Sequence, residues 1–497
     1  MLHRKIFALI LVLILVLILA VSSSAEEYTP GDVIVVLKPS SSEKVSASSL
    51  EVSASEFASS FSASVKEFYP ALSVKDGGAF MMIHSESFDA EELSAILRDN
   101  PNVAAVSPNY KIHAAVVPND SAYGECWGME DINSPAAWNL STGSDNVYVA
   151  IIDSGIDHTN PDLTANVAVD LSYRTVTGST RDAVDDYGHG THVAGIIGAK
   201  GNNGIGVAGI NWNVKMIPVK ALDQSGNGSI ATVISAVNYV TSLIEQGMNI
   251  RAVNLSLETY IALEPNHDNL VAFPLWRAFK VLDNTNKAVI VVAAGNYSET
   301  VGEPSSYAHG HVPSAGCYVY PASFLGLDNM ISVSALAQMP LIGTTYTALF
   351  SNRGANISAP GVEILSTWLQ SVQADVRSDG VSLESKQGTS MAAPHVAGAA
   401  ALLASVMPSY ATAYQIKRCI LIGDDLDVYA SLRYQQDNFS SLPSVGTEGR
   451  AYDDYADYSE SDYVNPGNGN SSSGCSSLSL GIIAAVTVLM LARKRMS

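Results

Sequence analysis

The sequence predicts an α/β protein in which helices cover both faces of a mostly parallel sheet, preceded by a smaller α+β domain. Between residues 121 and 432, short apolar runs rich in β-branched residues alternate with stretches of helical character. Such alternation is typical of a parallel sheet whose strands are connected by helices. The apolar runs lack polar alternation, as expected for strands that are buried on both faces.

The expected elements follow this alternation along the chain. Strands are predicted at residues 147–152, 214–220, 251–257, 288–294, 330–335 and 362–367, and helices at 193–199, 229–244, 271–282 and from Ser390 to 407. Upstream, strands are predicted at 31–38, 79–84 and 103–106, with one helix before residue 63 and another at 90–98. The last predicted helix of the larger domain is rich in alanine, which favours a helix buried on most sides.

Length, composition and charge narrow the class of protein. The chain has 497 residues, enough for two or three domains, and its 47% hydrophobic content supports large cores. The formal net charge of -21 argues against nucleic acid or anionic membrane surfaces as partners. This acidity fits a soluble exported protein.

The amino terminus has the composition of a secretory signal peptide. His3, Arg4 and Lys5 precede an apolar run at residues 6–21, and small residues follow up to Ala25. This order predicts a signal peptide over residues 1–25 that is cut after about Ala25. Because the apolar run is long, a retained membrane anchor is the alternative.

Three stretches carry an acid, an imidazole and a hydroxyl at the ends of predicted elements. Asp153 follows the strand at 147–152, and His189 lies at a glycine-flanked turn before a helical run. Ser390 begins the helix of the sequence GTSMAAPHVAG, where unpaired backbone N–H groups favour negative charge. An imidazole that is oriented by a carboxylate can remove the proton of a serine, so these residue types predict nucleophilic catalysis. Taken alone, the last stretch fits a small-residue core helix equally well.

The motifs DSGID, HGTHVAG and GTSMAAPHVAG, in this order, resemble those of the subtilisin-like serine peptidases. The resemblance covers residues 127–407 and implies that fold and a serine endopeptidase that works through an acyl-enzyme. It assigns catalysis to Asp153, His189 and Ser390, with the Asn296 side chain and the Ser390 N–H as oxyanion donors. His192 and His395 are expected in the core. The sequence lacks the GxSxG elbow of α/β-hydrolase esterases around Ser390.

The resemblance also places a substrate-binding edge around Ser256 and Leu257, with Gly295 beside it. Glu258 stands where relatives have glycine. One hypothesis is that Glu258 favours a basic residue before the scissile bond. The alternative, which the apolar segment HAAVVPN favours, is a broad, apolar-leaning specificity with Glu258 facing solvent.

Residues 26–117 resemble the inhibitor propeptide of the same peptidases, a ferredoxin-like module that caps the active site until it is cut away. The resemblance implies an intramolecular inhibitor and self-processing between His113 and Asp120. The peptidase domain is predicted to span residues 118–435. Its substrates would be proteins or peptides, and we expect a monomer.

A structural calcium ion is implied by a loop that resembles the strong calcium site of this family. Asp162 and Asn203 would supply side-chain oxygens, and Gly201, Ile205 and Val207 would supply carbonyls, the hard ligands that Ca²⁺ prefers. The alternative is an Asn-Gly turn without metal. The sequence shows no zinc-type Cys/His cluster and implies no organic cofactor.

The last residues of the sequence predict a protein that is tethered to a cell surface. Residues 436–474 have the composition of a disordered acidic spacer rich in Ser, Gly and Asn. Residues 475–497 hold Cys475, an apolar run at 478–492 and a terminal basic cluster, and resemble the C-terminal sorting tails of bacterial surface proteins. A retained membrane anchor is the alternative. The four cysteines, Cys126, Cys317, Cys419 and Cys475, show no paired spacing, so one disulfide is possible but its partners are not defined.

The sequence therefore predicts an exported serine endopeptidase at a cell surface or outside the cell, made as a self-processed zymogen. A dedicated maturation peptidase for a few surface proteins is the first alternative. An inactive surface-binding module that keeps the fold is the second, and the presence of all four catalytic side chains argues against it.

Overall fold

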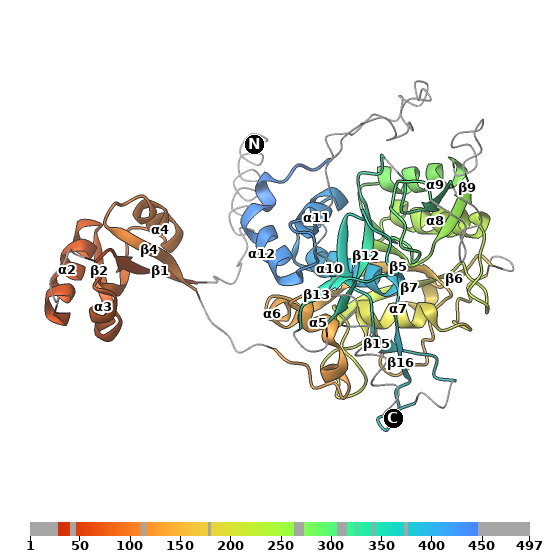
Figure 1. Cartoon of the computed structure of the whole chain (residues 1–497), viewed down its shortest axis with the longest axis horizontal. Helices are drawn as coiled ribbons and strands as arrows, with labels where there is room; N and C mark the ends of the chain where they lie inside the picture. The colour runs from red at the N-terminus through yellow and green to blue at the C-terminus, as the bar shows by residue number, and fades with distance from the viewer. Residues whose placement is uncertain are drawn as a thin grey trace, which may run out of the picture. The chain divides into compact units, whose positions relative to one another are not determined.

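The computed structural model describes residues 28–39, 46–110, 116–176, 180–262, 273–305, 316–324, 326–339, 343–371 and 376–445. The chain forms two compact units, Met1–Ala114 and Ala115–Ser497 (Figure 1). The predicted signal peptide and C-terminal tail lie outside the described residues.

The first unit is a four-stranded antiparallel sheet with helices. Its elements in order are β1(Tyr28–Leu37), α2(Ala47–Ser60), β2(Ala63–Phe68), α3(Pro70–Asp76), β3(Phe80–Ser85), α4(Ala90–Arg98) and β4(Val103–Tyr110). The strand order β2-β3-β1-β4 is that of a ferredoxin-like module. Helix α4 matches its predicted bounds because a capping box of Asp89 and Glu92 marks its start. Strand β2 and helix α3 were not predicted.

The second unit is built on an eight-stranded sheet of order β13-β12-β10-β8-β5-β7-β6, with β14 paired to β12. The strands are β5(Gly143–Asp153), β6(Tyr173–Arg174), β7(Asn213–Lys220), β8(Ile250–Leu255), β10(Val289–Ala293), β12(Met330–Gln338), β13(Thr345–Thr347) and β14(Ile357–Pro360). All pairs are parallel except that of β12 with β13. The predicted α/β fold is therefore correct.

Helices cover both faces of this sheet. On one side lie α7(His189–Gly198) and α10(Thr389–Val406), and on the other α8(Ile230–Glu245) and α9(Phe273–Asn284) (Figure 1). Strand β5 shows why: Val149 and Ile151 pack in the first core, whereas Ala150 and Ile152 pack in the second. A central strand with apolar side chains on both faces requires a helical layer on each.

Helix α10 is the one described helix that is long and apolar enough to cross a membrane, yet it is mostly buried within the second unit. It contacts β5, β8, β10 and β12. The helix thus lies at the centre of the core of the second unit, as its alanine content predicts, and it carries Ser390 near its start.

Shorter elements complete this unit. Near its start are η1(Tyr123–Glu125), α5(Trp127–Asp131) and α6(Ser134–Trp138), followed by η2(Val169–Leu171), and at its end α11(Ala413–Ile420), α12(Val428–Asn438) and η4(Phe439–Ser441). Two small antiparallel pairs join β9(Thr259–Ala262) to β11(Cys317–Tyr320), and β15(Ile364–Thr367) to β16(Leu383–Lys386). The strand predicted at 362–367 therefore lies outside the main sheet.

The predicted start of the disordered spacer, residue 436, is wrong. Helix α12 continues to Asn438, and Phe439 and Leu442 pack against the core of the second unit. The carbonyl of Leu442 accepts a hydrogen bond from Gln415, and that of Ser444 accepts one from Asn286. These two apolar side chains, in a largely polar stretch, extend the folded unit to at least residue 445.

Candidate active site

The end of a central strand and the start of a helix bring the predicted acid and base together. Asp153 is the last residue of β5 and is fully buried. His189 is the first residue of α7, and its Nδ1 lies 2.8 Å from Asp153 Oδ1. Because an ionised carboxylate can only accept, Nδ1 carries the proton and Nε2 is the basic atom of the neutral ring.

The environment of His189 makes it a stronger base than an ordinary histidine. Burial of the ring lowers the pKa of His189, but the charge of Asp153 and its hydrogen bond to the ring outweigh burial and raise it. The carboxylate stabilises the imidazolium that forms when the ring takes up a proton. The pair is therefore suited to general-base catalysis.

The turn before His189 is built by Asp185, a residue that the sequence analysis missed. Asp185 Oδ1 accepts hydrogen bonds from the backbone N–H of Tyr187 at 3.0 Å and of Gly188 at 2.9 Å. Its Oδ2 accepts from the backbone N–H and the hydroxyl of Thr191. One buried carboxylate thus satisfies donors on both sides of His189 and fixes where α7 begins.

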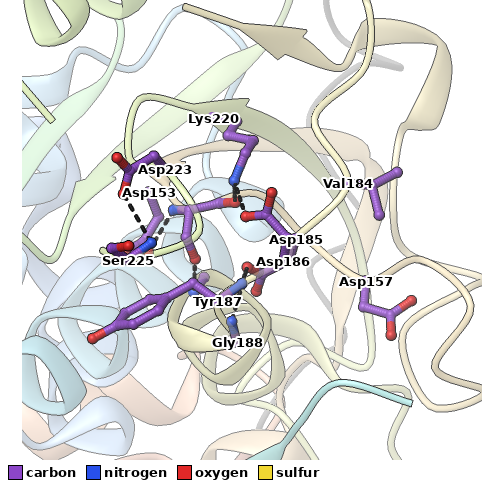
Figure 2. Close-up of polar contacts among 12 residues, drawn as sticks. Asp153, Asp157, Val184, Asp185, Asp186, Tyr187, Gly188, Lys220, Asp223 and Ser225 are labelled. Carbon is purple, nitrogen blue, oxygen red and sulfur yellow. Dashed lines mark hydrogen bonds and ion pairs between the residues drawn. The ribbon is translucent and has the colours of Figure 1, made fainter. Parts of the chain in front are cut away.

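Lys220 supports the same region from the end of β7. Its side chain is almost fully buried, and Nζ donates to the carbonyl of Ser154 and to Asp186 Oδ1, each at 2.6 Å. Figure 2 shows Lys220 pointing toward Asp186. Because Ser154 directly follows Asp153, this lysine ties the acid's strand to the loop that leads to His189.

The predicted nucleophile begins helix α10. Gly388 precedes the helix with φ 145°, a left-handed conformation that favours glycine. Ser390 Oγ donates to the carbonyl of Ser256 at 3.2 Å, and Ser256 Oγ donates to the carbonyl of Ser390 at 2.8 Å. Among the described residues, no hydrogen bond joins Ser390 to His189 in this structure. Catalytic hydrogen bonds are often loose without substrate and tighten when it binds.

The predicted oxyanion residue is tied to the nucleophile's turn. Asn296 follows β10 and Gly295, and its Oδ1 accepts from the Thr389 N–H at 2.8 Å and from the Thr389 hydroxyl at 3.1 Å. Thr389 immediately precedes Ser390. Because Oδ1 is occupied in this way, the Nδ2 end of the Asn296 amide faces away from Thr389 and can act as a donor.

The other histidines near the motifs are core residues. His192 is fully buried, and its Nε2 lies 3.0 Å from the carbonyls of Ile364 and Glu384. His395 is buried beside the Met391 carbonyl. Burial lowers the pKa of His192 to about 3 and that of His395 to about 4. Both rings are therefore neutral at physiological pH.

The expectation that Glu258 faces solvent is wrong. Glu258 is half-buried, and its Oε2 is buried without a hydrogen-bond partner. A side chain added at Gly295 would come within 2.8 Å of this oxygen. Leu257 is half-buried and packs against the second core, and Glu258 Oε2 lies beside Gly295, the residue before Asn296.

The predicted calcium loop surrounds a buried carboxylate. Asp162 is fully buried, with Oδ1 accepting from Asn203 Nδ2 and Oδ2 from the Val207 N–H, both at 2.8 Å. Burial raises the pKa of Asp162 to about 7, and the charges of Asp120 and Asp379 add to the rise. Asp120 is also buried, and its Oδ1 lacks a hydrogen-bond partner. Asp120 was not among the predicted calcium ligands.

The carboxylate oxygens of Asp162 and Asp120 fit a hard cation. Buried carboxylates with uncompensated charge are costly unless a cation or donors neutralise them. In the part of the chain that the structure describes, no three His, Cys, Asp or Glu side chains form a metal-binding group. Carbonyls such as those of Ile205 and Val207 would have to complete the coordination. Gly201 packs against the Trp212 ring, where a side chain would clash.

The fold, with the acid at the carboxyl end of β5 and the imidazole and hydroxyl at the starts of α7 and α10, defines a serine endopeptidase. The Subtilase family matches residues 144–423, more than half of the chain. The chain belongs to this family.

Three curated proteins of similar sequence are named as proteases or subtilisins. The chain is 32% identical over 320 residues to the thermophilic serine proteinase of Bacillus sp. (strain AK1), covering 64% of this chain and 67% of that protein. It is 31% identical over 359 residues to the extracellular protease of Xanthomonas campestris pv. campestris, covering 65% and 56%. Subtilisin E of Bacillus subtilis is 32% identical over 319 residues, covering 64% and 69%.

A solved protease structure from Pseudoalteromonas arctica shares the fold. The TM-score is 0.50 at 24% identity, with 64% of this chain and 99% of that chain covered. The structural likeness supports the subtilisin-like α/β architecture and nothing finer.

Proposed function

We propose that this chain is an exported endopeptidase, made as a zymogen, that hydrolyses peptide bonds through an acyl-enzyme on Ser390. The observation that carries the proposal is the hydrogen bond between His189 and buried Asp153, on the same sheet edge as Asn296 and Ser390. The Subtilase match and the serine-protease relatives support the reaction class.

The roles follow from the chemistry of each side chain. His189 Nε2 removes the Ser390 proton as Oγ attacks the substrate carbonyl, and Asp153 stabilises the resulting imidazolium. The negative charge that develops on the carbonyl oxygen is stabilised by Asn296 Nδ2 and the Ser390 N–H. His189 then protonates the leaving amine, and water hydrolyses the acyl-enzyme by the same steps.

Protein or peptide chains are the proposed substrates. The segment from Ser256 to Glu258 would pair with the substrate backbone, and Gly295 would line the pocket for the residue before the scissile bond. The Ser256 carbonyl already contacts Ser390 Oγ, which supports a substrate edge next to the nucleophile.

The first unit is proposed to be the inhibitor propeptide. Its ferredoxin-like strand order and its compactness as a separate unit support this role. The boundary between the units, at Ala114 and Ala115, falls inside the proposed processing region between His113 and Asp120.

Export and surface attachment are further parts of the proposal. The basic and apolar amino terminus supports export, and so does similarity to a relative named as an extracellular protease. The apolar run at 478–492 with its basic end supports attachment to a membrane or cell surface.

Calcium is proposed to stabilise the second unit through Asp162, Asn203 and carbonyls of Gly201, Ile205 and Val207. Saturating calcium should raise the Tm, since a ligand at a hundred times its Kd stabilises the folded state by about 2.7 kcal/mol. Asp162→Asn should lose this response, as measured by thermal melts in EGTA and in calcium. Magnesium at equal concentration is the control, because it prefers smaller octahedral sites. An equal calcium response in wild type and variant would contradict the assignment.

The proposed function is tested with a fluorophosphonate probe on the processed wild-type protein. We expect one label, located on Ser390 by peptide mass mapping, and loss of casein hydrolysis in proportion to labelling. Peptidase activity that persists after complete labelling of Ser390, or labelling at another serine, would contradict the proposed nucleophile.

A further inference from the structure

Two buried polar side chains lie at the end of β8, on the face where α10 packs. Along this strand Val253 and Leu255 pack in the second core, whereas Ala252 packs in the first core together with α10. Asn254 follows Ala252 on that same face, because side chains alternate along a strand, and Ser256 comes directly after the strand. Both polar residues are buried, Asn254 completely. Buried polar groups are costly unless they form hydrogen bonds, so their partners are informative.

Helix α10 lacks a backbone donor for the nucleophile's own carbonyl. In an α-helix the carbonyl of each residue accepts a hydrogen bond from the N–H four positions later. Four positions after Ser390 stands Pro394, inside α10, and proline has no backbone N–H. The proline ring also crowds the carbonyl four residues before it. The Ser390 carbonyl therefore lacks its usual helical donor and needs one from another element.

Ser256 supplies this donor. Its Oγ donates to the Ser390 carbonyl at 2.8 Å, and Asn254 Nδ2 donates to Ser256 Oγ at 3.0 Å. The direction of these bonds is fixed, because a carbonyl only accepts, and the hydroxyl that donates to it can accept from the amide. Ser390 Oγ in turn donates to the Ser256 carbonyl at 3.2 Å. Two hydrogen bonds thus hold both the backbone and the side chain of the nucleophile to the end of β8.

Asn254 connects these bonds to the strands that carry the other catalytic groups. It is paired with Ile151 on β5 and with Val291 on β10. Strand β5 ends at Asp153, and β10 leads to Asn296. Asn254 Oδ1 is buried and has no hydrogen-bond partner among the described residues, a cost that an apolar side chain would avoid. Departures of this kind from an apolar core are expected at functional sites.

We propose that Ser256 and Asn254 are positioning residues for the nucleophile. The Ser256 hydroxyl, oriented by Asn254, replaces the N–H that Pro394 lacks and fixes the backbone of Ser390. The inference rests on the proposed function of Ser390. A fixed backbone sets the position from which Oγ attacks and the position of the N–H that meets the oxyanion. Because misplacing reacting groups by about 1 Å costs about a hundredfold in rate, loss of this support should lower turnover more than substrate binding.

The first test compares kcat and KM of the processed wild type, Ser256→Ala and Ser256→Thr on one peptide anilide, with active sites counted by fluorophosphonate titration. Ser256→Ala leaves a buried carbonyl without its donor, so kcat should fall about tenfold with little change in KM. Ser256→Thr keeps the hydroxyl and should recover most of this loss. Ser431→Ala is the matched control and should behave as the wild type. Ser431 Oγ is also buried and donates to a backbone carbonyl, that of Asp427, but it lies in α12.

The second test is a double-mutant cycle with Pro394→Ala, which restores a backbone N–H four positions after Ser390. In that background the carbonyl has a helical donor again, so adding Ser256→Ala should lower kcat by about twofold or less, against about tenfold in the wild type. Such non-additivity shows that the two changes act on the same carbonyl. The cycle also supplies the measurement if Ser256→Ala alone does not fold, because the double variant keeps a donor for the carbonyl.

Three outcomes would overturn the inference. The first is an unchanged kcat in Ser256→Ala. The second is an equal loss of kcat from Ser256→Ala with and without Pro394→Ala, because the hydroxyl would then act on another group. The third is a change confined to KM, which would make Ser256 a residue whose side chain binds substrate. A wild type that neither labels nor turns over would instead refute the proposed function. Thermal melts of each variant identify any loss caused by misfolding.

Discussion

Ser390→Ala is expected to abolish peptide hydrolysis and to leave the first unit attached. Removing the nucleophile should lower kcat about a millionfold, the size of this effect in subtilisin, a member of the same family. The acyl-enzyme cannot form, so a chain that processes itself cannot release the segment that ends between His113 and Asp120. Intact mass spectrometry of wild type and variant, expressed identically, measures both the processing and the new amino terminus.

A mixing experiment separates self-processing from processing in trans. Active wild type added to purified Ser390→Ala should trim the variant if cleavage can occur between molecules. A variant that matures at the wild-type rate with no peptidase added would contradict the assignment of Ser390. If both proteins remain full-length while the wild type still labels with fluorophosphonate, activation requires another peptidase.

Asp153→Asn is expected to lower kcat about ten-thousandfold without changing the fold. An asparagine amide can donate to His189 Nδ1 and so favour the tautomer that cannot take the serine proton. The variant also removes the charge that outweighs burial, so the pKa of His189 should fall. Activity is lost as pH drops through this pKa, and the acidic limb of kcat/KM should therefore move to lower pH.

Asp157→Asn is the matched control. Asp157 lies in the same motif, but its carboxylate accepts from Thr159 and from the Gln370 N–H, not from His189. We expect nearly full kcat and an unchanged pH profile, with some loss of thermal stability. A loss of activity equal to that of Asp153→Asn would show that the two carboxylates were assigned incorrectly.

The sequence predicted the elements whose signals are local and strong. Buried strands such as β10 are continuous apolar runs, and α4 carries a capping box, so both were located closely. Strand β2 was missed because it is short and none of its side chains is fully buried, although Ala63, Val65 and Phe68 pack against the core of the first unit. The separation of β15 from the main sheet depends on its pairing with β16, which sequence pattern does not show.

The residues of the candidate site likewise fall into those that the sequence predicted and those that it did not. Asp153, His189, Asn296 and Ser390 lie in recognisable motifs at the ends of elements, so their placement could be predicted. Asp185, Asp120 and Lys220 act through contacts between segments that are distant or irregular, and a carboxylate or ammonium in a loop gives no sign of its partner. Glu258 was misjudged because a lone glutamate is usually exposed. The burial of its Oε2 depends on tertiary packing, which the sequence pattern does not show.

The link between Thr389 and Asn296 joins segments that are 93 residues apart in the chain. The positions of the attacking Ser390 hydroxyl and of the developing oxyanion are therefore set by neighbouring atoms of Thr389, Ser390 and Asn296. When the surrounding loops fluctuate, both places move together and their separation is kept. Reaction geometry of this kind tolerates motion of the cleft walls, so substrate-binding loops can diverge between relatives while the chemistry remains the same.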